Sequence, residues 1–317
     1  MSPIELLAVA KPSPLLAPQL AREGYVVHEG PLGQDRAGFD AVAPRIRGIV
    51  CAGDSRVDAE LIAQLPALEI VAVNGVGYDG IAVAAAKARG AVVTHTPDVL
   101  NEDVADLAIA LMLGFSRQLV QADAHVRSGR WASEGAMALG RRVSGARLGL
   151  VGIGRIGQSI AKRAEAFGMQ VAYTARNARP GLSYAYHPDA AALAAASDYL
   201  VVITPGGEGT RGLIDARVLK ALGPNGVLVN VARGSVVDED ALIAALESKT
   251  IAGAALDVFA QEPHVPERLR ALPNVLLAPH IGSATQSTRQ AMADLVMANL
   301  TAHFGGQPLP SAVPECR

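Results

Sequence analysis

Hydrophobic residues along the chain gather into two series of short apolar runs, separated by segments in which apolar positions return every three or four residues. The first series consists of IELLAVA, YVVHE, IRGIVCAG, LEIVAVNG and AVVTHT, with helical segments such as DAELIAQL and IAVAAAKARG between them. Strands that are buried on both faces of a parallel sheet are apolar throughout. The alternation therefore predicts a parallel α/β unit from about Met1 to Pro97.

The second series consists of RLGLVGIG, MQVAYTAR, DYLVVITP, GVLVNVAR, TIAGAALDVF and NVLLAPH, and it predicts a second doubly wound sheet from about Arg147 to His280. Between the two series lies NEDVADLAIALMLGFSRQLVQADAHVRSG, whose helical periodicity predicts one long helix joining the units, with Asn101 as its N-cap. A further helix, from about Thr285 to Phe304, is long enough to return the chain to the first unit.

Length and charge limit the class of protein and its partners. The chain has 317 residues, which favours two domains, and its formal net charge of -2 gives no general attraction to nucleic acid or anionic membranes. The start carries Glu5 and no basic leader, so it is interpreted as a strand and not as an export signal. The apolar stretch from Leu107 to Phe115 is far shorter than the ~20 residues of a membrane span.

Cysteine and histidine usage points to a reducing compartment and to no metal site. Cys51 and Cys316 are too few for a disulfide framework or a zinc site, and the histidines other than His280 show no metal-ligand spacing. We therefore expect a cytoplasmic protein that binds no metal, nucleic acid or membrane.

A glycine-rich turn begins the second series. Gly152, Gly154 and Gly157 have GxGxxG spacing, directly after an apolar strand and directly before a helical pattern. In that context the glycines permit a tight turn, close approach of backbone amides to a pyrophosphate, and tight packing of the helix on the strand. We interpret the turn as a dinucleotide site; the alternative is an ordinary strand-to-helix turn.

The strand that follows carries basic residues where an NAD-binding protein carries an acid. An Asp or Glu about 20 residues after the glycines would accept hydrogen bonds from the ribose hydroxyls, but TARNARP contains no acid. Thr174, Arg176, Asn177 and Arg179 instead suit a 2′-phosphate, which a guanidinium binds with charge-assisted hydrogen bonds. NADP(H) is therefore favoured, with NAD(H) possible if Arg176 only stacks on adenine or lies in solvent.

Polar residues follow three of the last predicted strands. Arg233 follows GVLVNVA, Asp257 and Glu262 follow TIAGAAL, and His280 follows NVLLAP. Ligands of open α/β sheets collect at the carboxyl ends of strands, so these side chains are expected to share one site. Each of them alone has a structural interpretation, as a surface charge or a turn residue.

The set resembles the D-2-hydroxyacid dehydrogenase family of NAD(P)-dependent oxidoreductases over nearly the whole chain. The matching stretches are GVGYDGI, TPDVLNEDVADLAIALML, GLVGIGRIGQSIAKR, NVARGSVVDEDAL, AALDVFAQEP and APHIGSAT. The resemblance implies two doubly wound α/β domains with a cleft between them: a flavodoxin-like substrate domain (residues 1–98 and 285–317) and a Rossmann cofactor domain (residues 99–284). It also implies a homodimer held through the cofactor domain, where Trp131 is expected to pack at a domain or subunit contact.

The resemblance assigns the catalytic roles to Arg233, Glu262 and His280, and chemistry supports them. Reduction of a 2-oxo acid needs a cation for the carboxylate and carbonyl, which fits Arg233, and an acid for the developing alkoxide, which fits His280. Glu262 would orient the imidazole and favour its charged form.

Further contacts are implied by the same resemblance. The substrate carboxylate is expected at the backbone amides of Val76 and Gly77, with Ser283 close to substrate or nicotinamide. The remaining implied cofactor-binding residues are Gly152, Gly154, Arg155, Ile156, Gly157, Thr174, Arg176, Asn177, Thr204, Pro205, Val231, Ala232, Asp257, His280 and Gly282.

Departures from related branches narrow the substrate. Glu262 stands where formate dehydrogenases of this superfamily have Gln, which argues against formate as the substrate. GVGYD lacks the lysine expected for phosphite oxidation, which argues against phosphite. The chain resembles most the NADPH-preferring glyoxylate/hydroxypyruvate and hydroxyphenylpyruvate reductases. We expect a small 2-oxo acid such as glyoxylate or hydroxypyruvate, reduced to the D-2-hydroxy acid; an aromatic 2-oxo acid is the alternative. A dinucleotide-sensing interaction protein is the hypothesis from another class.

Overall fold

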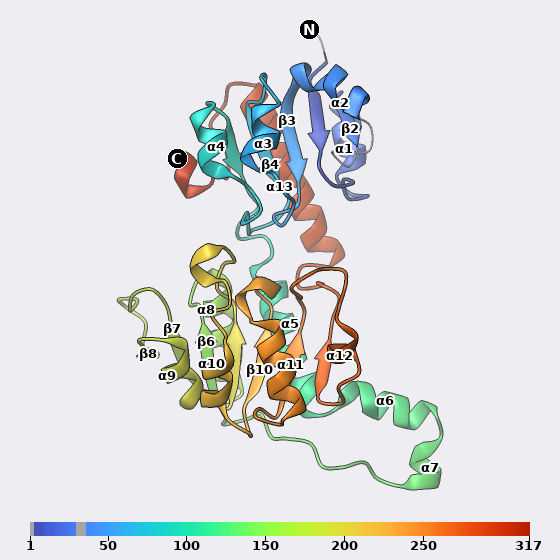
Figure 1. The fold of residues 1–317 in the computed structure, drawn as a ribbon, viewed down its shortest axis with the longest axis vertical. Helices are drawn as coiled ribbons and strands as arrows, with labels where there is room; N and C mark the ends of the chain where they lie inside the picture. The colour runs from blue at the N-terminus through green and yellow to red at the C-terminus, as the bar shows by residue number, and fades with distance from the viewer. Residues whose placement is uncertain (1–2, 30–35) are drawn as a thin grey trace. The chain divides into compact units, whose positions relative to one another are not determined.

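The computed structural model describes residues 3–29 and 36–317, which form two compact units (Figure 1). The first consists of Met1–Leu100 and Ala284–Arg317, and the second of Asn101–Ser283. Met1 and Ser2, at the start of the predicted first unit, lie outside the described residues. Each unit is built on one parallel sheet, so the predicted two-sheet α/β fold is confirmed.

The first unit has a five-stranded sheet in the order β2-β1-β3-β4-β5, which is the flavodoxin-like order. All five strands were predicted, and the structure begins and ends them a few residues inside the apolar runs. Their bounds are β1 Glu5–Ala8, β2 Val26–Glu29, β3 Ile46–Cys51, β4 Ile70–Val73 and β5 Val92–Thr94.

Alternate residues of these strands face opposite layers of helices. Leu6, Val50 and Ile70 pack on one face, and their neighbours Leu7, Ile49 and Val71 pack on the other. The first face is covered by α1 (Ala17–Arg22) and α13 (Gln286–Phe304), and the second by α3 (Ala59–Ala63) and α4 (Val83–Ala88). The short helices α2 (Arg36–Val42), η1 (Ala43–Arg45) and η4 (Pro314–Cys316) complete the described part of this unit.

Helix α13 returns the chain to the first unit, as its length predicted. Thr285 caps it, because its side-chain oxygen accepts the Thr288 N–H at 3.2 Å. Its buried residues Ala293, Val296 and Leu300 join the hydrophobic core of the first sheet.

The second unit has a seven-stranded sheet in the order β12-β11-β10-β9-β6-β7-β8. Counted from β6, this is the Rossmann order 3-2-1-4-5-6 with a seventh strand added at one edge. The strands are β6 Arg147–Val151, β7 Gln170–Thr174, β8 Ala185–His187, β9 Tyr199–Val202, β10 Val227–Asn230, β11 Gly253–Leu256 and β12 Val275–Leu277.

Strand β8 was not predicted. It has three residues, none of them buried, and it pairs with β7 at the sheet edge. A strand this short and this exposed lacks the apolar run that identified the other six.

Two layers of helices enclose the second sheet. One layer is formed by α9 (Ala190–Ala195), α10 (Ala216–Leu222), α11 (Glu239–Glu247) and α12 (Glu267–Arg270), whose apolar residues build the main core of this unit. On the other side α5 (Asn101–Ser116) packs against α8 (Arg155–Ala166) and contacts β10, β11 and β12. Two 3-10 turns, η2 (Glu208–Thr210) and η3 (Gly234–Val236), lie in the loops.

The prediction of one long helix is wrong, because the helical segment breaks at residues 117–118. Helix α5 ends at Ser116, Gln118 adopts a left-handed conformation (φ 53°), and α6 (Leu119–Arg127) and α7 (Arg130–Glu134) follow. The Ser116 carbonyl accepts the Arg141 N–H at 2.8 Å, and the Ser116 hydroxyl bonds Tyr199. These tertiary contacts hold the end of α5 in place, and helical periodicity does not encode them.

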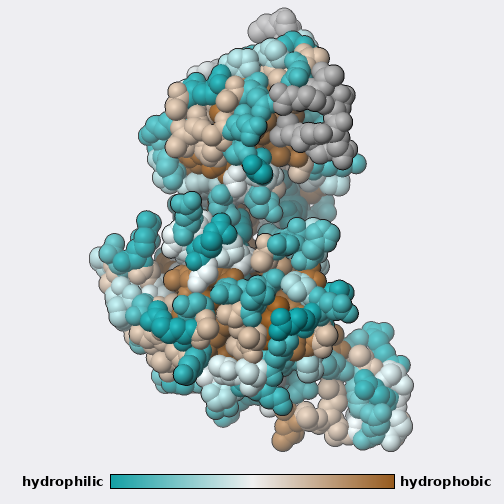
Figure 2. Space-filling model, viewed as in Figure 1, coloured by the Kyte–Doolittle hydropathy of each residue, from teal (hydrophilic) through white to brown (hydrophobic). Residues whose placement is uncertain are grey.

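The segment of α6 and α7 extends away from the sheet of the second unit (Figure 1) and exposes large apolar side chains. Leu119, Val120, Val126 and Trp131 are 56–63% exposed, and Leu139, just after α7, is 97% exposed. Figure 2 shows hydrophobic residues at the surface of this segment. None of the described helices is both long and apolar enough to cross a membrane.

Candidate functional site

The predicted catalytic residues come from three neighbouring strands of the second sheet. Arg233 follows β10, Asp257 follows β11 directly, Glu262 lies further along the same loop, and His280 follows β12. These strands are parallel and adjacent, so their carboxyl ends lie at the same edge. The structure therefore brings together side chains that are up to 47 positions apart in the sequence.

His280 and Glu262 form a direct pair. The His280 Nδ1 atom lies 2.6 Å from Glu262 Oε2, and the other carboxylate oxygen accepts the Phe259 N–H at 2.9 Å. Because a carboxylate only accepts, Nδ1 carries the proton of this hydrogen bond. The Nε2 atom of the half-buried ring is then the one that can exchange a proton with a substrate.

The contact between His280 and Glu262 shifts the pKa of both groups. The hydrogen bond to Glu262 raises the pKa of His280 above its ordinary value, against the opposing effects of burial and of the Arg233 charge. Burial raises the pKa of Glu262, but the hydrogen bonds from His280 and from the Phe259 N–H outweigh it, so the net pKa is lowered. The arrangement favours an imidazolium beside a carboxylate, which is a proton donor held in one orientation.

Asp257 holds the loop that carries the imidazole. It is 2% exposed, and its two oxygens accept the N–H groups of Ile281 at 2.7 Å and Gly282 at 2.8 Å. Burial raises the pKa of Asp257, although these two hydrogen bonds act in the opposite sense. His280 itself has a left-handed backbone (φ 52°), and its N–H donates to the Asp257 carbonyl at 2.8 Å. Asp257 thus fixes an unusual backbone conformation at the proton donor.

Asn230 shapes the turn that presents Arg233, and the sequence reasoning missed it. Asn230 is 1% exposed at the end of β10; its amide donates to the Arg233 carbonyl at 3.1 Å and its oxygen accepts the Ala232 N–H at 3.1 Å. The Arg233 guanidinium donates to the Ala232 carbonyl at 2.8 Å and is half-buried. A polar residue ending an otherwise apolar strand was the available signal.

Gly234 and Glu239 join the Arg233 turn to the Glu262 loop, and both were missed. A Cβ atom at Gly234 would lie 1.9 Å from the carbonyl carbon and oxygen of Phe259, so only glycine permits this approach. Glu239, in the first turn of α11, accepts the Ala260 N–H at 3.1 Å. The loop that carries Glu262 is therefore held from two sides by the segment that follows Arg233.

The glycine turn has the geometry of a phosphate site. Cβ atoms at Gly152 and Gly157 would lie 2.9 Å from Thr204 N and 2.5 Å from Gly152 O, so close backbone packing requires both glycines. Gly152 also has φ 109°, and a Cβ at Gly154, the N-cap of α8, would meet nothing within 4 Å. No contact with the described residues therefore requires glycine at this position, and the helix N-terminus is open there, as binding of a pyrophosphate would require. Arg155 and Ile156 are the first residues of that helix.

The turn lies at the point where the strand order reverses. It follows β6, and the Thr204 it contacts follows β9, the neighbouring strand. Open α/β sheets bind ligands in the crevice at this position. Of the other predicted site residues, Pro205 is exposed, Thr204 and the predicted substrate contact Ser283 are half-buried, and Val231, Ala232 and Gly282 are buried.

The basic segment begins with Thr174, the buried last residue of β7, and is exposed from Arg176 onward. Thr174 is 7% exposed and its carbonyl accepts the Gly152 N–H at 3.0 Å, so it packs directly beside the glycine turn. Arg176, Asn177 and Arg179 are exposed, and the Arg179 N–H donates to the Tyr173 hydroxyl at 2.7 Å. Within the described residues, neither the Arg176 nor the Arg179 side chain has a hydrogen bond or ion pair. Both guanidinium groups are free to meet a phosphate.

The predicted carboxylate loop belongs to the first unit, where it follows β4. Neither the Val76 N–H nor the Gly77 N–H donates to another described residue. The side-chain oxygen of Asn74, at the start of the loop, is buried and also lacks a partner within the described part of the chain. The loop therefore offers backbone donors of the kind that bind an anion.

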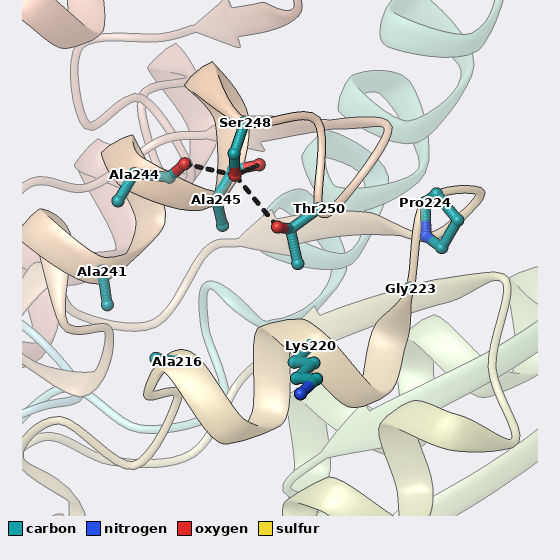
Figure 3. A pocket seen from close by; sticks show the side chains of 9 residues that line it. All are labelled: Ala216, Lys220, Gly223, Pro224, Ala241, Ala244, Ala245, Ser248 and Thr250. Atoms are coloured by element: carbon teal, nitrogen blue, oxygen red, sulfur yellow. Dashed lines mark hydrogen bonds between the residues drawn. The ribbon is translucent and has the colours of Figure 1, made fainter.

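No cluster of three or more His, Cys, Asp or Glu side chains that could hold a metal ion occurs in residues 3–29 and 36–317. A groove of about 540 Å³ lies between α10 and α11, lined by small side chains with Lys220, Ser248 and Thr250 (Figure 3). Its residues 223–224 and 250 precede β10 and β11, so the groove lies at the opposite edge of the sheet from Arg233 and His280.

Comparison with known proteins identifies relatives over most of the chain. The family model "D-isomer specific 2-hydroxyacid dehydrogenase, NAD binding domain" matches residues 109–282. Glyoxylate/hydroxypyruvate reductase A of Arabidopsis thaliana is 51% identical over 268 residues, covering 84% of this chain and 85% of that protein. Hydroxyphenylpyruvate reductase of Plectranthus scutellarioides is 47% identical over 271 residues, 86% of either chain.

A solved structure agrees over nearly the full length. The NADPH-dependent glyoxylate/hydroxypyruvate reductase of Sinorhizobium meliloti, in complex with NADP and malonate, has a TM-score of 0.93 and 46% identity, covering 99% of this chain and 98% of that one.

Proposed function

Because the chain belongs to the D-isomer specific 2-hydroxyacid dehydrogenase family, we propose that it reduces glyoxylate or hydroxypyruvate to the D-2-hydroxy acid with NADPH. The observation that carries this proposal is the His280–Glu262 pair at 2.6 Å, on the same sheet edge as Arg233 and in the unit that holds the glycine turn. The relatives are named as reductases of glyoxylate, hydroxypyruvate or hydroxyphenylpyruvate, which supports the same reaction class.

The chain's own residues supply binding and proton transfer. Arg233 binds the substrate carboxylate and polarises its carbonyl, because a planar guanidinium matches a carboxylate with two parallel hydrogen bonds. His280 donates the proton at Nε2 to the developing alkoxide, and Glu262 keeps the ring charged and oriented through Nδ1. The Val76 and Gly77 amides add the remaining donors for the carboxylate, and Ser283 lies three residues after His280 to contact substrate or nicotinamide.

The cofactor is held by the glycine turn and by the basic segment after β7. The Gly154 position and the α8 N-terminus bind the pyrophosphate, and Arg176 with Asn177 binds the 2′-phosphate, which favours NADPH over NADH. The remaining contacts with the cofactor are assigned to Thr204, Pro205, Val231, Ala232 and Asp257. When bound, the cofactor supplies the hydride for the carbonyl carbon.

A second candidate substrate is an aromatic 2-oxo acid. The relative from Plectranthus scutellarioides, named for hydroxyphenylpyruvate, is nearly as similar as the glyoxylate/hydroxypyruvate reductase from Arabidopsis. Pocket volume decides between the two substrate classes, since a phenyl group needs space that glyoxylate does not.

The protein is further proposed to act as a homodimer in the cytoplasm. Five large exposed apolar residues on and around α6 and α7, in the second unit, form a surface of the kind that a partner subunit covers. Cys51 and Cys316 are both free thiols, which is consistent with a reducing compartment.

The test is a panel of 2-oxo acids assayed with NADPH and with NADH. Loss of NADPH absorbance with glyoxylate and hydroxypyruvate is the expected result, and His280→Gln should lower kcat by about 10²- to 10⁴-fold, the contribution of general acid catalysis. A higher kcat/KM with hydroxyphenylpyruvate would select the aromatic substrate. Failure to oxidise NADPH with any 2-oxo acid, despite NADPH binding, would favour a dinucleotide sensor.

A further inference from the structure

We propose that His95 is a positioning residue that orients the Gly77 N–H toward the substrate carboxylate. The inference rests on the proposed function of the Val76–Gly77 loop and adds to it a side chain from the next strand. His95 lies just after β5, is 8% exposed, and belongs to the same unit as the loop.

The central contact is a hydrogen bond between His95 and the loop backbone. The His95 Nδ1 atom lies 2.9 Å from the Val76 carbonyl oxygen, and because a carbonyl only accepts, Nδ1–H is the donor. The Val76 carbonyl and the Gly77 N–H belong to one planar trans peptide and point in opposite directions. Anchoring the carbonyl on His95 therefore aims the Gly77 N–H away from the protein interior, as carboxylate binding requires. It also polarises the peptide, which strengthens that donor.

The loop is restrained on its other side as well. A Cβ atom at Gly53 would lie 1.8 Å from the Gly77 carbonyl oxygen, so the segment after β3 is in direct backbone contact with the loop. The Gly75 carbonyl accepts the Thr96 N–H at 2.8 Å. Three consecutive carbonyls of the loop, those of residues 75–77, thus face protein. The N–H groups of the same three peptides, those of Val76, Gly77 and Tyr78, therefore point away from it.

His95 is itself held by the C-terminal segment. Its N–H donates to the Ser311 carbonyl at 3.1 Å, and its carbonyl accepts the Ser311 hydroxyl at 2.6 Å. The Ser311 hydroxyl in turn accepts from Asn299, on α13, at 2.8 Å, and all three residues are buried. The imidazole also meets the Tyr78 ring edge-on, with centroids 5.3 Å apart. A buried, hydrogen-bonded scaffold of this kind supports precise placement of the loop.

Three variants at position 95 test the hydrogen bond. His95→Leu removes the donor and should raise the KM for glyoxylate about two- to twelve-fold, with kcat and the KM for NADPH within twofold of the wild type. His95→Asn places an amide N–H at the same number of bonds from Cα as Nδ1 and should restore the KM. His95→Gln moves the amide one bond further out and should behave like Leu; it replaces His95→Leu if that variant does not fold.

A matched control and a binding measurement complete the experiment. His28→Leu removes a histidine from the same unit that bonds Glu5 at 2.8 Å, and it should leave the KM for glyoxylate unchanged. Calorimetric titration of malonate into the NADP-loaded protein should show affinity falling in His95→Leu by the same factor as KM rises. This measurement needs no turnover. A wild type that binds malonate but does not reduce glyoxylate would therefore contradict the proposed reaction without contradicting the proposed role of His95.

Two results would overturn the proposal. One is a His95→Leu variant that folds and keeps the wild-type KM and malonate affinity. The other is a His95→Asn variant as impaired as His95→Leu, because ring packing and not the hydrogen bond would then be responsible.

Discussion

The proposed proton donor, His280, depends on one short contact between residues 18 positions apart. Glu262 holds the Nδ1 side of His280, and the carboxylate raises the pKa of the imidazole. In the proposed reaction the protonated ring is the form that reduction needs, so we expect reductive activity below the pKa of His280 and its loss as the pH rises through that pKa.

Removing the charge of Glu262 should therefore move the pH profile. Glu262→Gln keeps a hydrogen-bond acceptor but removes the anion, so the pKa of His280 falls and the reductive optimum shifts to lower pH. The pH dependence of kcat measures this shift. Glu247→Gln, at a carboxylate paired with Arg268 on α12, is the control and should leave the profile in place. An unchanged profile in Glu262→Gln would remove the pair from the mechanism.

Cofactor preference is also decided at the scale of single residues. The Arg176 side chain is exposed and unbonded within the described residues, so Arg176→Ala should change stability by less than about 0.5 kcal/mol. It should nevertheless raise the KM for NADPH far more than that for NADH, with about 1.5–3 kcal/mol at stake for a hydrogen bond to a charged group. Steady-state kinetics with both cofactors measures the difference.

The control for this prediction is Arg217→Ala, at an exposed arginine on α10. This substitution should change the KM for NADPH and the KM for NADH equally and only slightly. Equal losses for both cofactors in Arg176→Ala would mean that Arg176 stacks on adenine or supports the fold instead of binding the 2′-phosphate.

At the scale of elements, the turn between β6 and α8 contains two glycines that close backbone packing requires, Gly152 and Gly157, and one, Gly154, that is proposed to serve cofactor binding. Gly157→Ala would place Cβ 2.5 Å from the Gly152 carbonyl oxygen and should destabilise the unit by about 1–3 kcal/mol, as overpacking does. Gly154→Ala meets no protein atom within 4 Å. It should leave the melting temperature nearly unchanged and weaken NADPH binding, because its methyl group occupies the phosphate position.

Thermal denaturation and NADPH fluorescence titration, run on both variants, distinguish the two effects. A Gly154→Ala variant that binds NADPH as tightly as the wild type would place the pyrophosphate elsewhere.

At the scale of the whole molecule, the exposed apolar residues on and around α6 and α7 are proposed to be covered by a second copy of the chain. Val120 is 60% exposed and Leu139 is 97% exposed, so replacing both with Asp removes no internal packing of consequence. The double variant Val120→Asp/Leu139→Asp should be a monomer by light scattering, whereas the wild type should show twice the mass of the chain. Buried charges without partners oppose association.

Ala216→Asp is the control for the assembly experiment, because it adds a negative charge to an exposed residue of α10 in the same unit. It should remain a dimer. A wild type that is monomeric, or a double variant that stays dimeric, would contradict the proposed interface.

The sequence by itself determined all the described strands except β8, and the family from which the candidate site residues follow. Apolar runs such as LEIVAVNG are long enough to identify buried strands, and the glycine spacing, Arg233, Glu262 and His280 were identified because motifs are local. Residues whose role depends on a distant backbone were not identified. Gly234, Glu239 and the edge strand β8 have no local signature, and the only local signal of Asn230 is its place as the polar last residue of an apolar strand.

Only the tertiary structure decided which of these residues are in contact and how the contacts change their pKa values. The break at Gln118 follows from contacts of Ser116 with residues 25 and 83 positions away, and periodicity within one helix cannot report them. The raised pKa of His280 likewise arises from a carboxylate that only the adjacent ends of β11 and β12 bring to 2.6 Å. Local sequence fixes which elements form, because periodicity and propensity act over a few residues. Distances between side chains, and therefore protonation, depend on how those elements pack.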